Sequence, residues 1–388
     1  MSEHVFTPIK GSPEVNDVTV KFSDDEVSNL NTLVKLSKLP RETYEGKHRQ
    51  LGVTSAWMRD AKDKWENNFD WRATEAKLNA LPQWTTKVDE MTIHFVGIRS
   101  AHADAVPILL LHGWPGSFYE FYPLMHELRK STTPHFTIIA PSLPGYMFSS
   151  PPPTDRDYTQ GDVVTLLHRF MAQLGVGPYI AMGSDMGAQA ARGLTAHEAC
   201  RGCHLTMFLP HAAARCAVAE LPPHEAEGLQ RGKLWIEKSR AYSMMHATRP
   251  STIGHVLASS PLALLAWIAE KFLEWTDDDP DVGLVLEMAS LWWLAGCYPT
   301  SIYPYRQLMN QTEAWREEFK IRKPFGFSWF PKEVTPQPRA WIEGEGDMVF
   351  FKTHEKGGHF PAFEKPVELA EDIVEFARAL DVREKEKA

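Results

Sequence analysis

Hydrophobic and polar positions change their period several times along the chain, and each change marks a different kind of element. Near the start, Ser23-Asp-Asp-Glu26 is a capping box, and apolar positions at helical spacing follow it until Pro40. The same spacing predicts two more helices, at residues 55–69 and 71–81. We expect residues 1–20 to be an irregular leader. Residues 1–90 hold no cluster of reactive side chains, so we predict an extension that packs on the core.

From residue 85 onward, short apolar runs alternate with helical patterns. Residues 85–88 and 92–97 predict a hairpin. Further apolar runs are typical of buried parallel strands, and they occupy residues 108–111, 136–140, 179–182 and 205–209. A helical pattern at residues 161–174 stands between two of these runs. This alternation predicts βαβ units and a parallel sheet covered on both faces, and we assign residues 91–210 to its first part.

After residue 210 the pattern is helical only. Three long helices are predicted, at residues 225–245, 252–275 and 282–298. Strands return at residues 325–330 and 348–352, an amphipathic helix follows at 366–380, and the charge run at 383–388 is expected to be solvated. A helical insertion inside an α/β sheet predicts a lid over the active site. We place the lid at residues 211–320 and the second part of the core at 321–388.

Composition narrows the class of protein. The chain has 388 residues, with 43% hydrophobic and 11% aromatic residues, which is typical of a globular protein with a full core. A net charge of −9 argues against a nucleic-acid or anionic-membrane partner. No secretory signal and no run near the ~20 apolar residues of a membrane span is visible, and four cysteines suit reduced thiols. We therefore expect a cytoplasmic protein without a membrane anchor.

One segment combines strand, sharp turn and helix with a reactive side chain at its centre. Gly183-Ser-Asp185-Met-Gly187 has the Gly-x-Asp-x-Gly spacing of a nucleophile elbow, with aspartate where esterases carry serine. A Cβ at either glycine would crowd the strand against the helix. A carboxylate is ionised at neutral pH and can attack carbon without a base to activate it. The segment alone is equally compatible with a buried Asp185 that caps a helix.

A carboxylate nucleophile needs a pocket for the developing anion and a base for a second step. The turn His112-Gly-Trp-Pro-Gly-Ser117 follows a predicted strand and can aim the Trp114 N–H beside that of Met186, forming an oxyanion hole. The base candidate is His359, in a Gly-Gly-His-Phe segment after the last predicted strand. Nucleophile, acid and histidine then follow one another in the hydrolase order.

Two carboxylates compete to be the acid that orients His359. Glu333 directly follows a predicted strand and leaves one further strand before the histidine, which is where a third triad member stands. Asp347 lies at the entrance to that final strand, too close in sequence to reach round. On this topological ground we favour Glu333.

The group that stabilises the leaving atom depends on the reaction. If an epoxide is opened, its oxygen becomes an alkoxide and needs a proton or a short hydrogen bond, and tyrosine phenols on a lid suit that task. The lid region offers Tyr242, Tyr298, Tyr303 and Tyr305.

Two other motifs suggest a haem or a metal, but weakly. Cys200-Arg-Gly-Cys-His204 matches the c-type haem attachment pattern, but we interpret it as the link before the strand at 205–209. His354 and His359 are one residue too far apart for the helical zinc motif and lie in a Gly-rich loop. We expect no metal and no organic cofactor.

Taken together, these motifs resemble those of a microsomal-type epoxide hydrolase of the α/β-hydrolase fold, in the branch that includes soluble fungal enzymes. The shared motifs are His112-Gly-Trp-Pro-Gly-Ser117, Pro141-Ser-Leu-Pro-Gly-Tyr146, Gly183-Ser-Asp-Met-Gly187, Thr248-Arg-Pro-Ser-Thr-Ile-Gly-His255, Lys323-Pro-Phe-Gly-Phe327 and Gly357-Gly-His-Phe360. The resemblance covers nearly the whole length. It implies a mostly parallel central sheet with helices on both faces, a helical lid, and an N-terminal extension that wraps the core.

The resemblance also implies roles for single residues. Asp185 is then the nucleophile, His359 the general base and Glu333 the charge-relay acid, at a position where soluble fungal members tend to have aspartate. Tyr242 and Tyr305 match the lid motifs that activate the epoxide. The implied partner is a small-molecule epoxide, with no cofactor and a possible homodimer.

Two alternatives remain open at this stage. A haloalkane or haloacid dehalogenase shares the aspartate elbow and the histidine base, and would use lid side chains as halide donors. The candidate donors are Trp235, Trp267, Trp292 and Trp293. The second alternative is a catalytically silent binding protein of the same fold. The presence of Asp185, Glu333 and His359 argues against it, because a protein without catalysis could lose any of the three.

Overall fold

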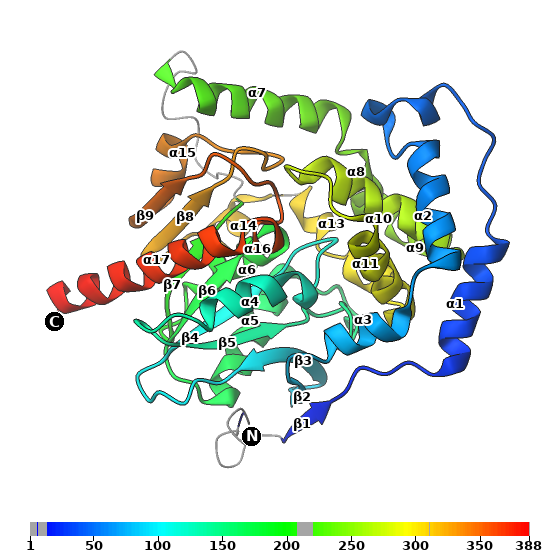
Figure 1. The fold of residues 1–388 in the computed structure, drawn as a ribbon. Helices are drawn as coiled ribbons and strands as arrows, with labels where there is room; N and C mark the ends of the chain where they lie inside the picture. The colour runs from blue at the N-terminus through cyan, green and yellow to red at the C-terminus, as the bar shows by residue number, and fades with distance from the viewer. Residues whose placement is uncertain (1–5, 7–13, 208–219, 310, 388) are drawn as a thin grey trace.

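A nine-stranded sheet runs through the centre of the structure, a computed structural model that describes residues 6, 14–207, 220–309 and 311–387 (Figure 1). The strand order is β1-β2-β3-β5-β4-β6-β7-β8-β9. The strands are β1 (Val15–Val18), β2 (Gln83–Val88), β3 (Met91–Ile98), β4 (Val106–Leu111), β5 (Phe136–Pro141), β6 (Tyr179–Gly183), β7 (Cys200–Leu205), β8 (Phe325–Trp329) and β9 (Met348–Thr353). From β5 across to β9 all neighbours are parallel, whereas β1, β2 and β3 add antiparallel strands at one edge.

Helices cover both faces of this sheet, as the alternation of patterns predicts. One layer contains α4 (Tyr122–Leu128), α16 (Pro361–Glu364) and α17 (Pro366–Lys387), and the other contains α5 (Gln160–Leu174) and α6 (Asp185–Leu194) (Figure 1). Every residue of β4 is buried, which is why its sequence is a continuous apolar run rather than an alternating one. Because these strands are parallel, the carboxyl ends of β4, β6 and β8 lie at the same edge of the sheet. The loops that carry the predicted site residues begin there.

Between β7 and β8 the described residues form helices joined by turns, with no strand among them. The helices are α7 (Pro223–Lys238), α8 (Ala241–Thr248), α9 (Pro250–Leu257), α10 (Pro261–Trp275), α11 (Val282–Ala295), α12 (Tyr298–Ser301), α13 (Tyr305–Leu308) and α14 (Glu313–Glu318). The short helix α15 (Arg339–Glu343) precedes β9. No single described helix is long and apolar enough to cross a membrane, and the bent pair α9 and α10, which passes only when joined, turns by 116°.

The N-terminal segment contacts both the sheet and the helical insertion. It contains α1 (Asp24–Leu36), α2 (Ser55–Asn67), α3 (Trp71–Leu78) and the 3-10 turns η1 (Glu45–Lys47) and η2 (Arg49–Leu51). Strands β1 and β2 extend the sheet, and α1, α2 and α3 pack beside α10 and α11 (Figure 1). Arg49 forms an ion pair with Asp279, and Lys77 forms one with Glu287. The segment therefore bridges the sheet and the helices above it.

Two local predictions were wrong because strand pairing is decided by distant partners. Within the expected leader, residues 15–18 form β1, since β2 offers an open antiparallel edge. The segment from Cys200 to His204 was expected to be a link, yet it forms most of β7, between the parallel neighbours β6 and β8. The predicted strand at 205–209 thus begins too late, and its last two residues lie outside the described part of the chain.

The predicted lid helices are divided more finely than their apolar spacing indicates. The pattern at 225–245 breaks at Ser239 and Arg240, giving α7 and α8. The pattern at 252–275 breaks before Pro261, where Ser260 caps α10. At the chain end, α17 extends through the predicted solvated run as far as Lys387. Ion pairs from Arg383 to Asp347 and from Arg201 to Glu384 accompany this extra length.

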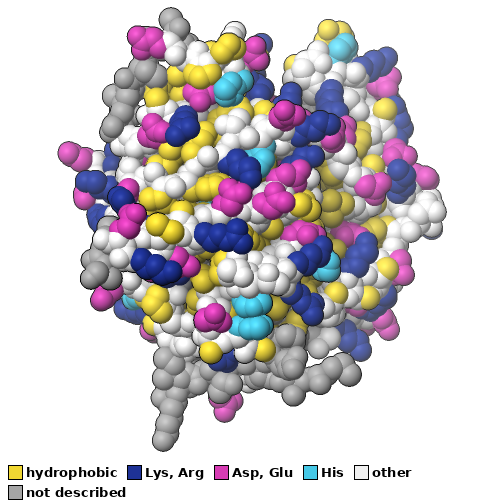
Figure 2. All heavy atoms as spheres, turned by 60° about the vertical axis from the view of Figure 1, so that its left-hand side comes forward, with side chains coloured by type: hydrophobic (Ala, Val, Ile, Leu, Met, Phe, Trp, Pro, Cys, Tyr) yellow, Lys and Arg dark blue, Asp and Glu magenta, His cyan; other side chains and the backbone are white. Residues whose placement is uncertain are grey.

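Charges of both signs are interspersed on the surface. In Figure 2, Lys and Arg side chains lie among Asp and Glu side chains across the face shown. On this face, therefore, neither sign of charge is gathered into one patch.

Candidate active site

The aspartate elbow is a tight turn between β6 and α6. Asp185 has φ of +51°, in the left-handed region, which costs a residue with a Cβ about 1–2 kcal/mol. A Cβ on Gly187 would lie 1.9 Å from the Leu111 carbonyl oxygen, and one on Gly183 would lie 2.3 Å from the Gly187 carbonyl oxygen. The glycines therefore have the mechanical role predicted from the sequence. Together they lift the Asp185 side chain above the edge of the sheet.

Three predicted residues from three separate loops meet at this elbow. The His359 Nε2 atom lies 3.7 Å from Asp185 Oδ2, and His359 Nδ1 lies 2.8 and 3.0 Å from the two carboxylate oxygens of Glu333. The Asp185 side chain is 12% exposed, while those of His359 and Glu333 are almost fully buried. Because Nδ1 donates to Glu333, Nε2 is the nitrogen that faces the Asp185 carboxylate.

Backbone groups hold both partners of this pair in place. The Val334 N–H donates to Glu333 Oε1 at 2.6 Å, and Arg231 donates to the Glu333 carbonyl at 2.9 Å. The His359 N–H donates to the Trp275 carbonyl at 2.8 Å. The imidazole is thus fixed by its carboxylate partner and by its own main chain.

The structure separates the two candidate acids clearly. Glu333 follows β8 and contacts His359, whereas Asp347 precedes β9 and is exposed. Asp347 forms an ion pair with Arg383 at 3.1 Å. Since β8 and β9 are parallel, the end of one strand and the start of the next lie at opposite edges of the sheet. The topological preference for Glu333 agrees with this arrangement.

The two N–H groups predicted to form an oxyanion hole lie beside the Asp185 carboxylate. The Trp114 N–H donates to Asp185 Oδ1 at 2.9 Å. The Met186 N–H also stabilises the carboxylate and lowers its pKa. One oxygen of Asp185 is therefore held by the backbone, while Oδ2 faces His359.

Charges around the elbow shift the pKa values of both reacting groups. Burial raises the pKa of Asp185, although His359 and the two N–H donors oppose this effect. For His359, burial alone would lower the pKa, but Glu333, Asp185 and Glu120 together raise it to about 9. The imidazole is therefore protonated near neutral pH, and the Glu333 and Asp185 carboxylates both favour this form.

Two of the four lid tyrosines pack against each other and against Trp114, in the turn after β4. Tyr242 on α8 and Tyr305 on α13 have ring centroids 5.8 Å apart. Both contact the Trp114 ring, which Tyr242 stacks on at 5.4 Å and Tyr305 meets edge-on at 5.9 Å. Burial raises the pKa of each phenol well above its ordinary value, and the charge of Asp185 raises it further. Both phenols are thus protonated donors.

The hydroxyl groups distinguish these two tyrosines from the others. The Tyr305 hydroxyl is buried and makes no hydrogen bond of normal geometry, although Tyr242 is near enough for each phenol to affect the pKa of the other. Tyr298 is bonded to His246 at 2.8 Å, and Tyr303 donates to the Pro144 carbonyl at 3.2 Å. Tyr242 and Tyr305 therefore interact with each other, whereas Tyr298 and Tyr303 are bonded elsewhere.

The weaker sequence motifs do not assemble into a cofactor site. Cys200 and Cys203 are buried within β7. His354 bonds Asp372 at 2.6 Å, while His359 bonds Glu333. Across the described residues, no group of three or more His, Cys, Asp or Glu side chains is placed to hold a metal ion.

Three charged or titratable side chains near the elbow were not singled out by the sequence. Glu120 is buried, and burial raises its pKa to about 8. Its Ser-x-x-Glu spacing from Ser117 indicates only a capping box, which it does form on η3 (Phe118–Phe121). His246 and Lys271 lie on apolar helix faces, where periodicity predicts core packing and says nothing of charge.

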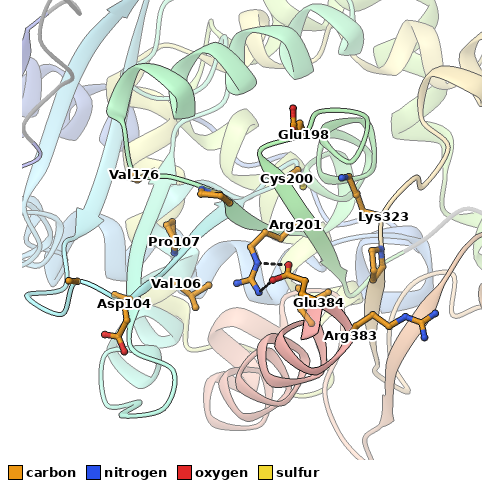
Figure 3. Close-up of a pocket in the computed structure, with 15 residues that line it drawn as sticks. Asp104, Val106, Pro107, Val176, Glu198, Cys200, Arg201, Lys323, Arg383 and Glu384 are labelled. Carbon is orange, nitrogen blue, oxygen red and sulfur yellow. Dashed lines mark hydrogen bonds and ion pairs between the residues drawn. The ribbon is translucent and has the colours of Figure 1, made fainter. Parts of the chain in front are cut away.

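Two pockets differ in what they contain. A cleft of about 960 Å³ lies between the segment 49–54 and helices α7, α8 and α10, and Tyr242 and Lys271 line it. A second pocket, of about 620 Å³, lies at the opposite edge of the sheet and is lined by Arg201, Lys323 and Arg383 among others (Figure 3). None of the predicted site residues lines the second pocket. The first cleft contains Tyr242, whereas Asp185 and Met186 line a separate small pocket of about 40 Å³.

Comparison with known proteins agrees with this geometry. Residues 106–226 match the family described as the alpha/beta hydrolase fold, and residues 15–121 match the family described as the epoxide hydrolase N terminus. The Aspergillus niger epoxide hydrolase structure superposes with a TM-score of 0.92 at 43% identity, covering 96% of this chain and 99% of that one. The fold is thus an α/β-hydrolase fold.

Sequence relatives identify the particular family. A Dothistroma septosporum protein whose name places it among the epoxide hydrolases is 36% identical over 97% of this chain and 93% of its own length. Epoxide hydrolase 1 of Sus scrofa is 28% identical over 93% of this chain and 88% of its own length. The juvenile hormone epoxide hydrolase structure from Bombyx mori has a TM-score of 0.86 at 26% identity, covering 98% and 97%. This chain belongs to the epoxide hydrolase family.

Proposed function

We propose that the protein converts an epoxide and water to a vicinal diol through a covalent alkyl ester of Asp185. One observation carries the proposal. The Asp185 carboxylate lies beside the Trp114 and Met186 N–H groups and 3.7 Å from His359, and the lid tyrosines Tyr242 and Tyr305 pack together against the Trp114 ring. This set supplies a nucleophile, a base and a donor for the leaving oxygen.

In the first step, Asp185 Oδ2 attacks a ring carbon from the side opposite the epoxide oxygen. The new carbon–oxygen bond forms as the ring bond to the epoxide oxygen breaks. That oxygen takes up the negative charge, and the phenols of Tyr242 and Tyr305 stabilise it by donating to it. Because the Trp114 N–H already holds Oδ1 and the Met186 N–H also stabilises the carboxylate, the side chain is oriented before substrate arrives.

In the second step, water attacks the ester carbonyl. Alkylation removes the negative charge of Asp185, which is one of the charges that keep His359 protonated, so the pKa of His359 falls. His359 therefore loses its proton, which neutralises the negative charge held by the opened oxygen and its phenols. Neutral His359 then takes a proton from water as the water oxygen bonds to the ester carbonyl carbon, and Glu333 stabilises the imidazolium that forms. The Trp114 and Met186 N–H groups stabilise the tetrahedral oxyanion. The bond from the carbonyl carbon to the alkyl oxygen then breaks, that oxygen takes the remaining proton of the water, and the diol leaves with Asp185 ionised and His359 protonated.

The test is to stop the second step. His359→Gln, incubated with styrene oxide, should accumulate an ester whose mass equals protein plus substrate, on the peptide that carries Asp185. Asp185→Ala under the same conditions should stay unmodified. An absent adduct, or one on another peptide, would contradict the mechanism.

The dehalogenase alternative makes a different prediction. Two lid indoles are already engaged, since Trp292 donates to the Pro115 carbonyl at 2.9 Å and Trp267 donates to His246 at 3.1 Å. The wild-type protein should form diol from styrene oxide and release no bromide from a bromoalkane. Bromide release at a comparable rate would favour the dehalogenase. A homodimer and a cytoplasmic location stay predictions, which sedimentation and cell fractionation would test.

A further inference from the structure

A buried lysine lies against one of the two lid phenols. Lys271 on α10 is 1% exposed, and its Nζ atom lies 4.5 Å from the centre of the Tyr242 ring and 5.4 Å from that of Trp267. Its ion-pair partner is Glu270, whose side chain is 33% exposed. Burying an ammonium group is costly unless it is compensated, and Glu270, whose side chain is a third exposed, compensates it in part together with Glu274. The position of this cation therefore calls for a reason beyond packing.

The proposed reaction moves negative charge toward this lysine. Before ring opening the charge is on Asp185, and afterwards it is shared between the former epoxide oxygen and the phenols that donate to it. A cation over an aromatic face is attracted to the ring, and it is attracted more strongly when the phenol gains negative charge. An interaction that is stronger in the transition state than in the ground state accelerates the step.

The other groups around Tyr242 do not supply this positive charge. Its ring neighbours are Trp114, Trp235, Trp275, Tyr305 and His246. The His246 Nε2 atom accepts from the Trp267 indole N–H, so this nitrogen carries no proton. Burial and Lys271 together lower the pKa of His246 to about 3, which keeps the ring neutral. Glu274 and Glu270 carry the opposite charge.

We propose that Lys271 is a positioning residue for epoxide opening, whose buried ammonium stabilises the charge that reaches Tyr242. The inference rests on the proposed function. In the step it assists, the Asp185–carbon bond forms, the carbon–oxygen bond of the epoxide breaks, and the oxygen receives the Tyr242 proton. Lys271 donates nothing to the substrate and acts through the phenol alone. Tyr242 is therefore the stronger donor of the pair.

A double-mutant cycle isolates this effect. Lys271→Met removes the charge and keeps a long apolar side chain. With styrene oxide and rapid quenching, we expect it to slow formation of the Asp185 ester by about tenfold to thirtyfold. In the Tyr242→Phe background the same change should slow the step by less than about twofold, and in the Tyr305→Phe background it should keep its full effect. An equal loss in all backgrounds would overturn the proposal.

Controls separate charge from structure. Lys238→Met alters an exposed lysine of the same cleft and should leave ester formation unchanged. Hydrolysis of the preformed ester should be unaffected by Lys271→Met, whereas a general loosening of the lid would slow both steps. Lys271→Arg, which keeps the charge, should restore part of the rate. A wild-type protein that forms no Asp185 ester would contradict the proposed function itself, before Lys271 is in question.

A second variant covers the case in which Lys271→Met does not fold. Glu270→Gln leaves the ammonium in place and removes its partner carboxylate. More positive potential then reaches Tyr242, so ester formation should be as fast as in the wild type or up to severalfold faster. Slower ester formation in this variant would overturn the proposal.

Discussion

The sheet side and the lid side of the active site differ in how their polar groups are satisfied. On the sheet side, both oxygens of Glu333 contact His359, and the Trp114 N–H already holds Asp185. On the lid side, the Tyr305 hydroxyl is buried and makes no hydrogen bond of normal geometry. The first arrangement stabilises charges that exist before substrate binds. In the proposed mechanism, the second stabilises a charge that appears only as the ring opens, which is where catalysis gains most.

Removing the nucleophile should have the largest effect. Asp185→Ala should lower turnover on the order of 10⁴-fold or more, because nothing else on the sheet side can form the ester. Asp185→Gly should be equally inactive but more stable than the alanine variant by about 1 kcal/mol, since glycine adopts φ of +51° without strain. Diol assays and thermal unfolding measure both. Equal stability of the two variants would show that the elbow carries no strain.

The lid phenols come next. Tyr242→Phe and Tyr305→Phe should each slow ester formation by about 10²-fold, as the loss of one transition-state donor does. Neither should slow hydrolysis of a preformed ester, because the oxyanion hole and His359 belong to the sheet side. Rapid-quench mass spectrometry follows the two steps separately. Equal slowing of both steps would show that the tyrosines shape the site without donating to the oxygen.

The same contrast explains which features the sequence predicts. On the sheet side, each functional residue stands directly after a strand, so local pattern and chain order suffice to place Asp185, Trp114 and Glu333 at one edge. The elbow glycines are predicted for the same local reason. Here the elements β4, β6 and β8 occur within a few residues of their predicted bounds.

On the lid side, position depends on contacts between distant helices. Periodicity continues through Ser239 and Arg240, so it does not show that α8 starts afresh and turns Tyr242 toward Trp114. The choice of Tyr242 and Tyr305 among the lid tyrosines therefore rested on the family motifs and could not be made from the spacing of apolar residues. Lys271 shows the same limit more strongly, since nothing local distinguishes a lysine that reaches an aromatic ring from one that reaches solvent.

The pH dependence tests how strongly the charges within the sheet side are coupled. In the free enzyme the pKa of His359 is raised to about 9, and loss of the Asp185 charge on alkylation lowers it. Hydrolysis of the ester needs neutral His359, so its rate should rise about tenfold per pH unit and level off below pH 9. Glu333→Gln should move this midpoint to lower pH, because Glu333 raises the pKa of His359. Stopped-flow decay of the ester measures it, and a rate that falls with pH would contradict the base role.

The smallest effect is expected where the N-terminal extension meets the lid. Lys77 on α3 pairs with Glu287 on α11, which also accepts from the Tyr119 hydroxyl at 2.9 Å. The Lys77 side chain is 60% exposed, so Lys77→Met should lower stability by only about 0.5 kcal/mol, and Tm by about 1–2 °C.

The matched control for Lys77→Met is Lys130→Met, which breaks the exposed pair of Lys130 with Glu127 on the sheet side. If both changes are small and neither alters ester formation, the extension supports the lid by apolar packing of α1–α3 on α10 and α11 rather than through this ion pair. A loss above about 2 kcal/mol for Lys77→Met alone would mean that the variant leaves Glu287 as an uncompensated buried charge. The lid would then depend on the extension for its electrostatic balance, and its tyrosines would lose their placement before the sheet side unfolds.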